Sequence, residues 1–398
     1  MTITNKVSLK SVMAGNTPIA DVPDAPTIGA ATAGSTSATV AYTAATTGGA
    51  VTTFTATSTP GTITGTGASP ITVSGLTGGT SYTFKVKGTN STAIGPESAA
   101  SSSITTIILG AYFAGGYTGS YQSNIDKIAF AADTKSTISG TLSTIRADFQ
   151  GAANSGVAAY FAGGGNNGGS TSAIDKVTFA SDAVSTLSAT LSSARYGAQM
   201  AANSGTAVYT AGGYDGGYVS GIDKITFSAD AKTTLSATLT DGRSAGAGAA
   251  NSGTAAYFAG GYDAGTTNRV DKIAFSADTK TTIAAVLTGT VYNIGACANS
   301  GTAMYIAGGS PSNLSRIDKI AFSADTKTTL SAVLSTGRHQ ASGAANTGTA
   351  AYFSGGNDGG FISGIDKIAF SADTKTTLSA TLTSARQAHG GAANCGVL

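Results

Sequence analysis

A unit of about 48 residues recurs six times along most of the chain, and this repeat constrains the fold more than any other feature. Successive copies start at Tyr112, Tyr160, Tyr209, Tyr257, Tyr305 and Tyr352, with spacings of 48, 49, 48, 48 and 47 residues. Each copy reads approximately Y-F-A-G-G, a variable stretch, I-D-K-I-A-F-S-A-D-T-K-T-T-L, a second variable stretch, and G-A-A-N-S-G. Copies of one short unit bury their apolar faces against their neighbours.

Each copy contains four short segments with the character of strands. In the first copy they are Ala111–Ala114, Ile125–Phe130, Thr137–Leu142 and Phe149–Ala153. Asn, Asp, Ser and Gly separate the segments, and these residues favour turns. The 55 glycines and the 11% share of charged residues also favour strands and turns over long helices. The sequence predicts an all-β fold, and four strands in a period of this length are typical of one β-propeller blade.

The repeat resembles the kelch-type β-propeller family. The resemblance rests on an Arg eight residues before the Asn of the last turn, and on a double glycine after the first strand. The double glycines are Gly115-Gly116, Gly163-Gly164, Gly212-Gly213, Gly260-Gly261, Gly308-Gly309 and Gly355-Gly356. Kelch repeats usually carry a Trp on the outer strand, whereas this chain has no Trp and places Leu187, Leu235 and Leu330 in that region. The missing Trp argues against membership of the kelch family more than it argues against a β-propeller fold.

The phase of the repeat predicts how a ring of six blades closes. The array begins at a Y-F-A-G-G strand and ends on a G-A-A-N-C-G-V-L segment. We therefore expect residues 387–398 to supply the innermost strand of the first blade, so that neither end of the array leaves an open sheet edge. The predicted propeller covers residues 107–398.

Residues 21–106 do not share the repeat and resemble a fibronectin type III domain. Leu76 and Tyr82 match the tyrosine corner of that family, in which the Tyr hydroxyl bonds to the backbone nearby. Pro23 and Pro26 match its first strand, and Tyr42 stands where the family has a Trp. The predicted fold class is thus all-β, a fibronectin type III-like β-sandwich followed by a six-bladed β-propeller closed by the C-terminal strand. Residues 1–20 belong to neither domain, and an attachment arm and a disordered leader both remain open.

Two loops in every repeat vary strongly, whereas the other two hardly change. One variable loop follows the double glycine, and the other precedes the inner strand. The first set is 117–124, 165–173, 214–221, 262–269, 310–316 and 357–364; the second is 147–150, 196–199, 244–247, 292–295, 339–342 and 387–390. Successive connections of an up-and-down sheet alternate between its two ends, so both sets are expected on one side of the ring, here named the variable face. The opposite side, with the S-A-D-T-K and A-N-S-G turns, is named the uniform face.

Nearly all aromatic residues outside the predicted strands and the N-terminal domain fall in the variable loops. The candidate ligand-binding residues are Tyr117, Tyr121, Phe149, Tyr196, Tyr214, Tyr218, Tyr262, Tyr292, His339, Phe361 and His389. Aromatic rings with Asn, Asp and Ser on Gly-rich loops are suited to stacking on sugar rings or to burying a partner's side chain. The alternative is that these rings cover blade edges and fill the centre of the face.

A repeated Arg enters each inner strand from the variable face. Its copies are Arg146, Arg195, Arg243, Arg338 and Arg386, and Val291 takes the fifth place. A ring of donors for carboxylates at the channel mouth is one interpretation, and structural hydrogen bonds to neighbouring carbonyls are the other. The repeated Asp-Lys pair, first seen at Asp126-Lys127, points its two side chains to opposite faces of a strand, which favours structural contacts between blades.

Few residues in the sequence are candidates for catalysis or for metal and cofactor binding. Cys297 and Cys395 fall in blades that are not neighbours, so neither a disulfide nor a metal shared with the two histidines is expected. No carboxylate dyad is evident, and no Lys-Ser/Thr follows the double glycines as a phosphate loop requires. We expect no catalytic residue, no cofactor and no metal, although Asp215-Gly216-Gly217 and Asp358-Gly359-Gly360 leave calcium open. We therefore do not expect an enzyme.

The composition also bears on partners and location. A net charge of +2 gives no electrostatic signal for nucleic acid, and no window approaches 18 apolar residues, so neither nucleic-acid binding nor membrane insertion is expected. The N-terminus lacks a signal-peptide pattern. These modules without a signal peptide resemble those of tailed-phage virion proteins. The sequence thus favours a virion surface protein (a tail fibre, spike or decoration) that binds host-surface glycan or protein through the propeller and other virion proteins through its N-terminal part. A purely structural virion component and a propeller-scaffold enzyme are the alternatives.

Overall fold

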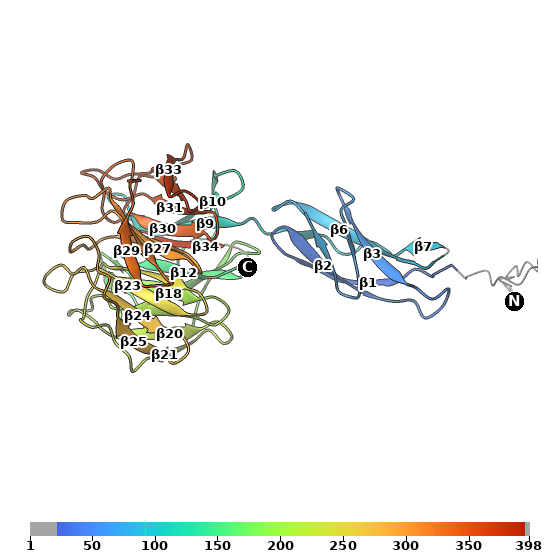
Figure 1. Ribbon diagram of the computed structural model, residues 1–398, viewed down its shortest axis with the longest axis horizontal. Coiled ribbons are helices and arrows are strands. Elements are labelled where there is room, and N and C mark those ends of the chain that lie inside the picture. The colour runs from blue at the N-terminus through green and yellow to red at the C-terminus, as the bar shows by residue number, and fades with distance from the viewer. Residues whose placement is uncertain (1–21, 92, 395–398) are drawn as a thin grey trace, which may run out of the picture. The chain divides into compact units, whose positions relative to one another are not determined.

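The computed structural model describes residues 22–91 and 93–394. The predicted arm at residues 1–20 and Cys395 lie outside the described residues. The chain divides into two compact units, Met1–Thr106 and Ile107–Leu398, and both are built from strands (Figure 1). In the described part of the chain, no helix is long and apolar enough to cross a membrane.

The N-terminal unit consists of two antiparallel sheets. One sheet has the order β1 (Thr27–Ala33), β2 (Ser37–Thr43) and β5 (Ile71–Ser74). The other has the order β4 (Thr64–Thr66), β3 (Thr53–Thr59), β6 (Ser81–Thr89) and β7 (Ile94–Glu97), with β8 (Ile104–Thr105) also paired to β6. Val40 and Val73 from the first sheet and Phe84 from the second belong to one buried cluster. Tyr82 is buried, and its hydroxyl oxygen accepts a hydrogen bond of 3.0 Å from the Thr77 backbone N–H, as the predicted tyrosine corner requires.

The second unit, here called the repeat unit, contains six four-stranded antiparallel sheets, numbered I to VI in chain order. From the first to the last strand of each sheet, sheet I is β34 (Gly390–Asn394), β9 (Gly110–Tyr117), β10 (Tyr121–Ala129) and β11 (Thr134–Thr137); sheet II is β12 (Gln150–Asn154), β13 (Ala158–Ala162), β16 (Ile174–Thr178) and β17 (Ala183–Thr186); and sheet III is β18 (Gln199–Asn203), β19 (Ala207–Ala211), β20 (Ile222–Thr226) and β21 (Ala231–Thr234). Sheet IV is β22 (Ala247–Asn251), β23 (Ala255–Ala259), β24 (Val270–Ala274) and β25 (Thr279–Thr282); sheet V is β26 (Gly295–Asn299), β27 (Ala303–Ala307), β28 (Ile317–Ala321) and β29 (Thr326–Thr329); and sheet VI is β30 (Ser342–Asn346), β31 (Ala350–Ser354), β32 (Ile365–Ala369) and β33 (Thr374–Thr377). A small hairpin of β14 (Gly165–Asn166) and β15 (Gly169–Ser170) lies in the loop of sheet II.

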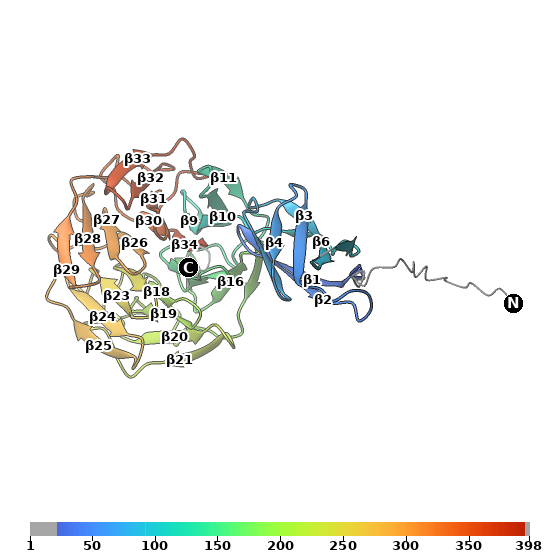
Figure 2. The same cartoon turned by 45° about the vertical axis from the view of Figure 1, so that its right-hand side comes forward.

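The first strands of the six sheets contact one another in a complete cycle. The order of contact is β34, β12, β18, β22, β26, β30 and back to β34. Figure 2 shows the sheets around a common centre, with the short outer strands on the circumference. Gly and Ala dominate these first strands, because six strands that meet at a centre leave little room for side chains. Six four-stranded sheets in this arrangement are consistent with a β-propeller.

The C-terminal strand completes the first sheet. β34 pairs with β9, with Ala392 opposite Tyr112 and Asn394 opposite Gly110. Thus the last copy of the G-A-A-N segment joins the first Y-F-A-G-G strand, as the phase of the repeat predicts. The predicted third strand is misplaced, however. Thr137–Leu142 was expected, whereas β11 is Thr134–Thr137, because the hairpin from β10 turns more tightly and already pairs Thr134 with Ala129.

The backbone geometry at the end of the first repeated strand explains why two glycines stand there. Gly115 and Gly116 both have positive φ angles, 63° and 105°. A side chain on Gly115 would lie 2.8 Å from the Arg146 carbonyl oxygen, and the Gly116 N–H donates a 2.9 Å hydrogen bond to the same oxygen. Only glycine combines this left-handed backbone with so close an approach.

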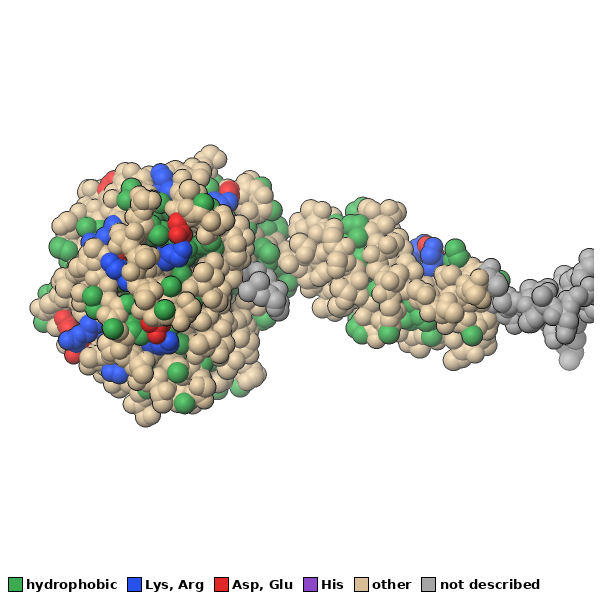
Figure 3. Space-filling model, viewed as in Figure 1, with side chains coloured by type: hydrophobic (Ala, Val, Ile, Leu, Met, Phe, Trp, Pro, Cys, Tyr) green, Lys and Arg blue, Asp and Glu red, His purple; other side chains and the backbone are tan. Residues whose placement is uncertain are grey.

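A Tyr–Lys–Asp contact joins each sheet to the next. In sheet IV, the Tyr257 hydroxyl donates to Asp325 Oδ1 (2.7 Å) and Lys272 Nζ donates to Asp325 Oδ2 (2.7 Å), where Asp325 lies in the β28–β29 turn of sheet V. The remaining five contacts join Tyr112 and Lys127 to Asp182, Tyr160 and Lys176 to Asp230, Tyr209 and Lys224 to Asp278, Tyr305 and Lys319 to Asp373, and Tyr352 and Lys367 to Asp133. On the side seen in Figure 3, acidic and basic side chains of the repeat unit lie in small neighbouring groups. The Lys of the Asp-Lys motif therefore holds neighbouring sheets together.

Candidate binding face

The two variable loops of every sheet lie against each other. In each sheet, an isolated β-bridge joins two residues. One directly follows the double glycine, and the other lies in the second variable loop, three residues before the first strand of the sheet. The pairs are Tyr117–Gln387, Ala147–Gly165, Tyr196–Tyr214, Ser244–Tyr262, Tyr292–Ser310 and His339–Asn357. In every sheet the two variable loops therefore lie at the same end, and the chain enters sheet I from the opposite end, where the Leu109 carbonyl accepts a hydrogen bond from the Phe130 N–H.

A ring of six backbone hydrogen bonds surrounds the axis at this face. Each ring residue donates its N–H to the carbonyl of the ring residue in a neighbouring sheet. In order around the cycle, the N–H groups of Asp148, Gly197, Ala245, Asn293, Gln340 and Ala388 donate to the carbonyl oxygens of Ala388, Asp148, Gly197, Ala245, Asn293 and Gln340, over 2.6–2.9 Å. All six residues have positive φ angles, between 54° and 66°. The ring fixes the bases of the second set of variable loops and so holds the face in one arrangement.

Five tyrosines form a continuous aromatic row on sheets III, IV and V. Their ring centroids follow one another at 5.5 Å (Tyr196–Tyr214), 5.2 Å (Tyr214–Tyr218), 5.7 Å (Tyr218–Tyr262) and 5.4 Å (Tyr262–Tyr292). Together with Ser244, Ala245 and Asn293 they line an open hollow of about 490 Å³. We call this hollow the tyrosine cleft. Its lining includes no charged side chain.

A second aromatic group lies where sheets VI and I meet. Tyr117 contacts Tyr121 at 5.1 Å and Phe361 at 5.8 Å between ring centroids, both edge to face. Phe361 is 37% exposed, and the two tyrosines are half-buried. We call these three residues the second cluster. In the cycle of six sheets, sheets I and VI lie opposite sheets IV and III, so the second cluster and the tyrosine cleft are on opposite sides of the axis.

The tyrosines of the cleft differ from the repeated tyrosines in burial and in hydrogen bonding. The six repeated tyrosines are almost completely buried, and each hydroxyl donates to an Asp. Burial and the hydrogen bond to Asp278 raise the pKa of Tyr209 to about 12. The cleft tyrosines are half-buried or, for Tyr196, 39% exposed, and among the residues that the structure describes no side chain accepts a hydrogen bond from their hydroxyls. Their hydroxyls are therefore not held by side chains as those of the repeated tyrosines are, although the Ala264 backbone hydrogen-bonds to Tyr218.

Two of the predicted binding residues are not at the surface. Phe149 is 4% exposed and packs edge to face on Phe161, 6.2 Å away. His389 is 3% exposed, and its Nε2 lies 2.8 Å from the Ser354 hydroxyl. Burial and the nearby charges of Arg386 and Arg338 hold the pKa of His389 well below its usual value. Both residues follow the ring positions 148 and 388, and both belong to the lining of a small cavity formed with the ring residues. They are therefore not part of the exposed surface that the sequence predicts, and their contact with a ligand stays a prediction.

His339 occupies an intermediate position. It is half-buried, and its Nδ1 lies 2.6 Å from the Asn313 side-chain oxygen. Partial burial lowers the pKa of the imidazole. His339 belongs to the variable face, but its hydrogen bond to the neighbouring loop gives it a structural role as well.

The repeated arginines are completely buried and do not form a mouth of exposed donors. Arg243 Nη1 lies 2.9 Å from Asp271 Oδ2, both side chains are 0% exposed, and Arg243 Nη2 donates to the Phe258 carbonyl (3.0 Å). The other pairs are Arg146–Asp175, Arg195–Asp223, Arg338–Asp366 and Arg386–Asp126. The donor-ring interpretation is therefore corrected, because a carboxylate of this chain already holds each guanidinium away from solvent. Desolvation lowers the pKa of Arg146, Arg195, Arg338 and Arg386 against the opposing attraction of the partner carboxylate.

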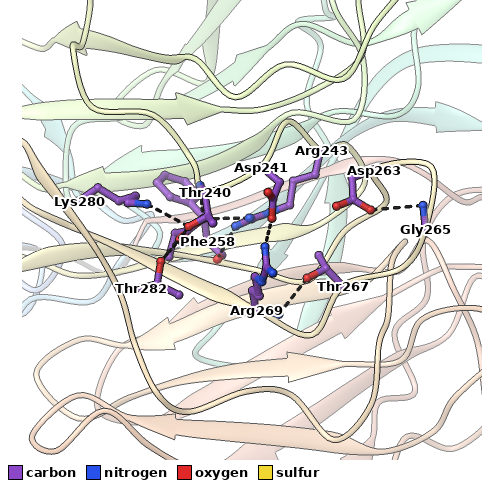
Figure 4. Close-up of polar contacts among 11 residues, drawn as sticks. Thr240, Asp241, Arg243, Phe258, Asp263, Gly265, Thr267, Arg269, Lys280 and Thr282 are labelled. Atoms are coloured by element: carbon purple, nitrogen blue, oxygen red, sulfur yellow. Dashed lines mark hydrogen bonds and ion pairs between the residues drawn. The ribbon is translucent and has the colours of Figure 1, made fainter.

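Figure 4 shows Arg243 with neighbouring residues, among them Thr240, Lys280 and Thr282. Thr240 lies in the segment that crosses from sheet III to sheet IV, and its hydroxyl contacts Lys280 and Thr282 of β25 (Figure 4). The Thr240 N–H also donates to Asp271 (3.0 Å). Close by, an exposed ion pair joins Asp241 to Arg269. Asp271 therefore fastens the crossing segment onto the sheet that follows it.

The fifth copy lacks the repeated Arg, and sequence reasoning missed what replaces it. Val291 is buried in the Arg position. Arg316, from the variable loop of the same sheet, brings its Nε to 3.8 Å from Asp318 Oδ2, and Thr288 donates to both oxygens of that carboxylate. An Arg two residues before Asp318 is a sequence signal for this replacement, but Arg269 stands in the same place before Asp271 in a copy that keeps its repeated Arg.

Candidate metal ligands are dispersed in the described part of the chain. No group of three or more His, Cys, Asp or Glu side chains is placed for a metal ion among residues 22–91 and 93–394. In the Asp358 loop, the carboxylate accepts a hydrogen bond from the Gly360 N–H, which shapes the turn.

Asp148 is a carboxylate whose pKa is raised. Burial raises it, and the hydrogen bond that Gln340 Nε2 donates to the carboxylate over 3.0 Å acts in the opposite direction.

Comparison with known proteins bears on the N-terminal unit. The family model described as Fibronectin type III domain matches residues 24–104, within the predicted range 21–106. No curated protein matches the chain. The match, the two sheets and the Tyr82 corner agree, so the chain is an all-β protein whose N-terminal unit is a fibronectin type III domain.

Proposed function

We propose that the repeat unit is a closed, six-bladed, kelch-like β-propeller and that its variable face binds glycan on the surface of a host cell. In this proposal the protein is a non-enzymatic surface component of a tailed-phage virion, a fibre, spike or decoration. Its N-terminal part contacts other virion proteins. The virion assignment rests on the resemblance of this module combination to tailed-phage surface proteins.

The observation that carries the binding proposal is the tyrosine cleft. Its five rings lie in loops that differ from copy to copy, while the scaffold beneath them repeats. Aromatic side chains provide a large contact area at low cost in conformational entropy, and their hydroxyls add adaptable hydrogen bonds. The backbone ring holds the bases of these loops in place, and preorganised loops lose less entropy on binding.

The proposal is tested with the full chain on a glycan array and on whole host cells. Tyr218→Ala should lower glycan affinity roughly ten-fold or more, because aromatic residues at the centre of a contact carry most of its energy. Tyr218→Phe keeps the ring and should retain most of the affinity if stacking dominates. Thr206→Ala changes an exposed residue of a uniform-face turn and should leave binding unchanged. Cell binding that survives Tyr218→Ala with Tyr262→Ala would contradict binding through the tyrosine cleft, whereas no cell binding by the unmodified chain would favour a purely structural role.

A further inference from the structure

The aromatic residues of the variable face are divided between two sides of the axis. The tyrosine cleft covers sheets III to V, and the second cluster covers sheets VI and I. The loops between them, 165–173 on sheet II and 310–316 on sheet V, contain no aromatic residue. A compact ligand held by the cleft alone would leave the second cluster without a role in recognition.

The region between the two aromatic groups is polar and ordered. The backbone ring surrounds the axis there, and the Gln340 and Asp148 side chains, from sheets VI and II, hydrogen-bond to each other across the ring at 3.0 Å. Asn293 and Ser244 lie at the edge of the cleft that faces the ring. A chain that leaves the cleft towards the second cluster therefore crosses a surface of amide, carboxylate and hydroxyl groups.

The charges of this face disfavour an anionic ligand. The five buried arginines are neutralised by their Asp partners, and the lining of the cleft contains no Lys or Arg. The charged residues next to the cleft tyrosines in sequence are Asp215, Asp263 and Arg195, of which Arg195 is buried and paired with Asp223, and Asp148 lies at the ring. The variable loops also contain Arg269 and Arg316, but these lie next to Asp241 and Asp318. An acidic polysaccharide in the cleft would therefore meet repulsion without a compensating cation in the lining, whereas an uncharged one would not.

We propose that the ligand is an extended, uncharged polysaccharide that lies across the variable face and contacts the tyrosine cleft and the second cluster at once. This inference rests on the proposed function and specifies its ligand. Two contacts on one chain raise the apparent affinity without either being strong, because the second binding event becomes intramolecular. The affinity should therefore depend on chain length.

The test measures binding of the full chain to uncharged oligosaccharides of two and six residues, taken from chitin, cellulose, amylose, mannan and galactan. Six-residue oligomers should bind at least ten-fold more tightly than two-residue oligomers of the same sugar. Phe361→Ala should remove this advantage and leave the two-residue affinity unchanged, whereas Tyr218→Ala should weaken both lengths. The matched control is Thr206→Ala, which should change neither.

The outcomes separate the inference from the proposed function. Equal affinity for both lengths, or a Phe361→Ala variant that keeps the full advantage, would overturn the two-cluster inference and leave glycan binding in place. Stronger binding to polysialic acid than to every uncharged probe, with an affinity that rises as salt is lowered, would overturn the uncharged ligand. Failure of every saccharide to bind would overturn both proposals.

Discussion

Replacing Asp271 with alanine is expected to lower the free energy of unfolding of the repeat unit by about 3–5 kcal/mol. The substitution leaves Arg243 fully buried with its charge unpaired, and it removes the acceptor of Thr240 and Thr282. Hydrogen bonds from Thr240 and the charge of Arg243 outweigh burial and lower the pKa of Asp271. This stabilisation is therefore present above the pKa of an unfolded aspartate, about 3.9, and is lost as the pH falls through the lower folded-state value.

The matched control is Asp241→Ala, which breaks the neighbouring exposed ion pair with Arg269. Because 39–47% of these two side chains is exposed, solvent screens their attraction, and a change of about 0–1 kcal/mol is expected. Thermal and denaturant unfolding of the full chain, followed for the repeat unit, measures both variants. Equal effects of the two substitutions would show that the buried pair does not hold the crossing segment.

Deletion of residues 390–398 is expected to abolish the cooperative unfolding of the repeat unit. The deletion removes β34, leaves β9 as an exposed edge, and interrupts the contacts from β30 through β34 to β12. The fibronectin type III domain has its own buried core and should keep a separate transition. Differential scanning calorimetry and limited proteolysis should thus show loss of one transition and persistence of the other.

A shorter deletion is the control for this experiment. Removing only residues 395–398 leaves every residue of β34 in place and should preserve the transition of the repeat unit. If the chain without residues 390–398 unfolds with unchanged cooperativity and midpoint, the C-terminal strand does not complete the first sheet in solution.

The scaffold could be predicted from the sequence because its constraints are repeated. Six copies of the Tyr112 strand, with the final copy of the inner segment left at the C-terminus, determine the number of sheets and the partner of β9. Because side chains alternate along a strand, the sequence also predicts that Asp126 and Lys127 point to opposite faces and do not pair with each other. The end of β11 could not be predicted, because Thr137 and the residues after it are equally compatible with a strand and with an extended crossing segment.

Burial at the variable face was the main limit of sequence reasoning. Phe149 and His389 share loops with exposed residues, and only the position of the backbone ring decides that their side chains point inward. The ring itself left an incomplete signal, since Asp148, Gly197 and Asn293 are residue types often found at positive φ, whereas Ala245, Gln340 and Ala388 are not. The burial of Arg243 depends on Asp271, 28 residues later in another strand, and no local pattern connects the two.

The most direct test of glycan recognition by the variable face is a crystal structure of the full chain with the best-binding six-residue oligosaccharide. The proposal predicts sugar rings stacked on Tyr218 and Tyr262, with the chain continuing across the backbone ring towards Phe361. Saccharide density on the uniform face or on the fibronectin type III domain, with the tyrosine cleft free of sugar, would contradict it.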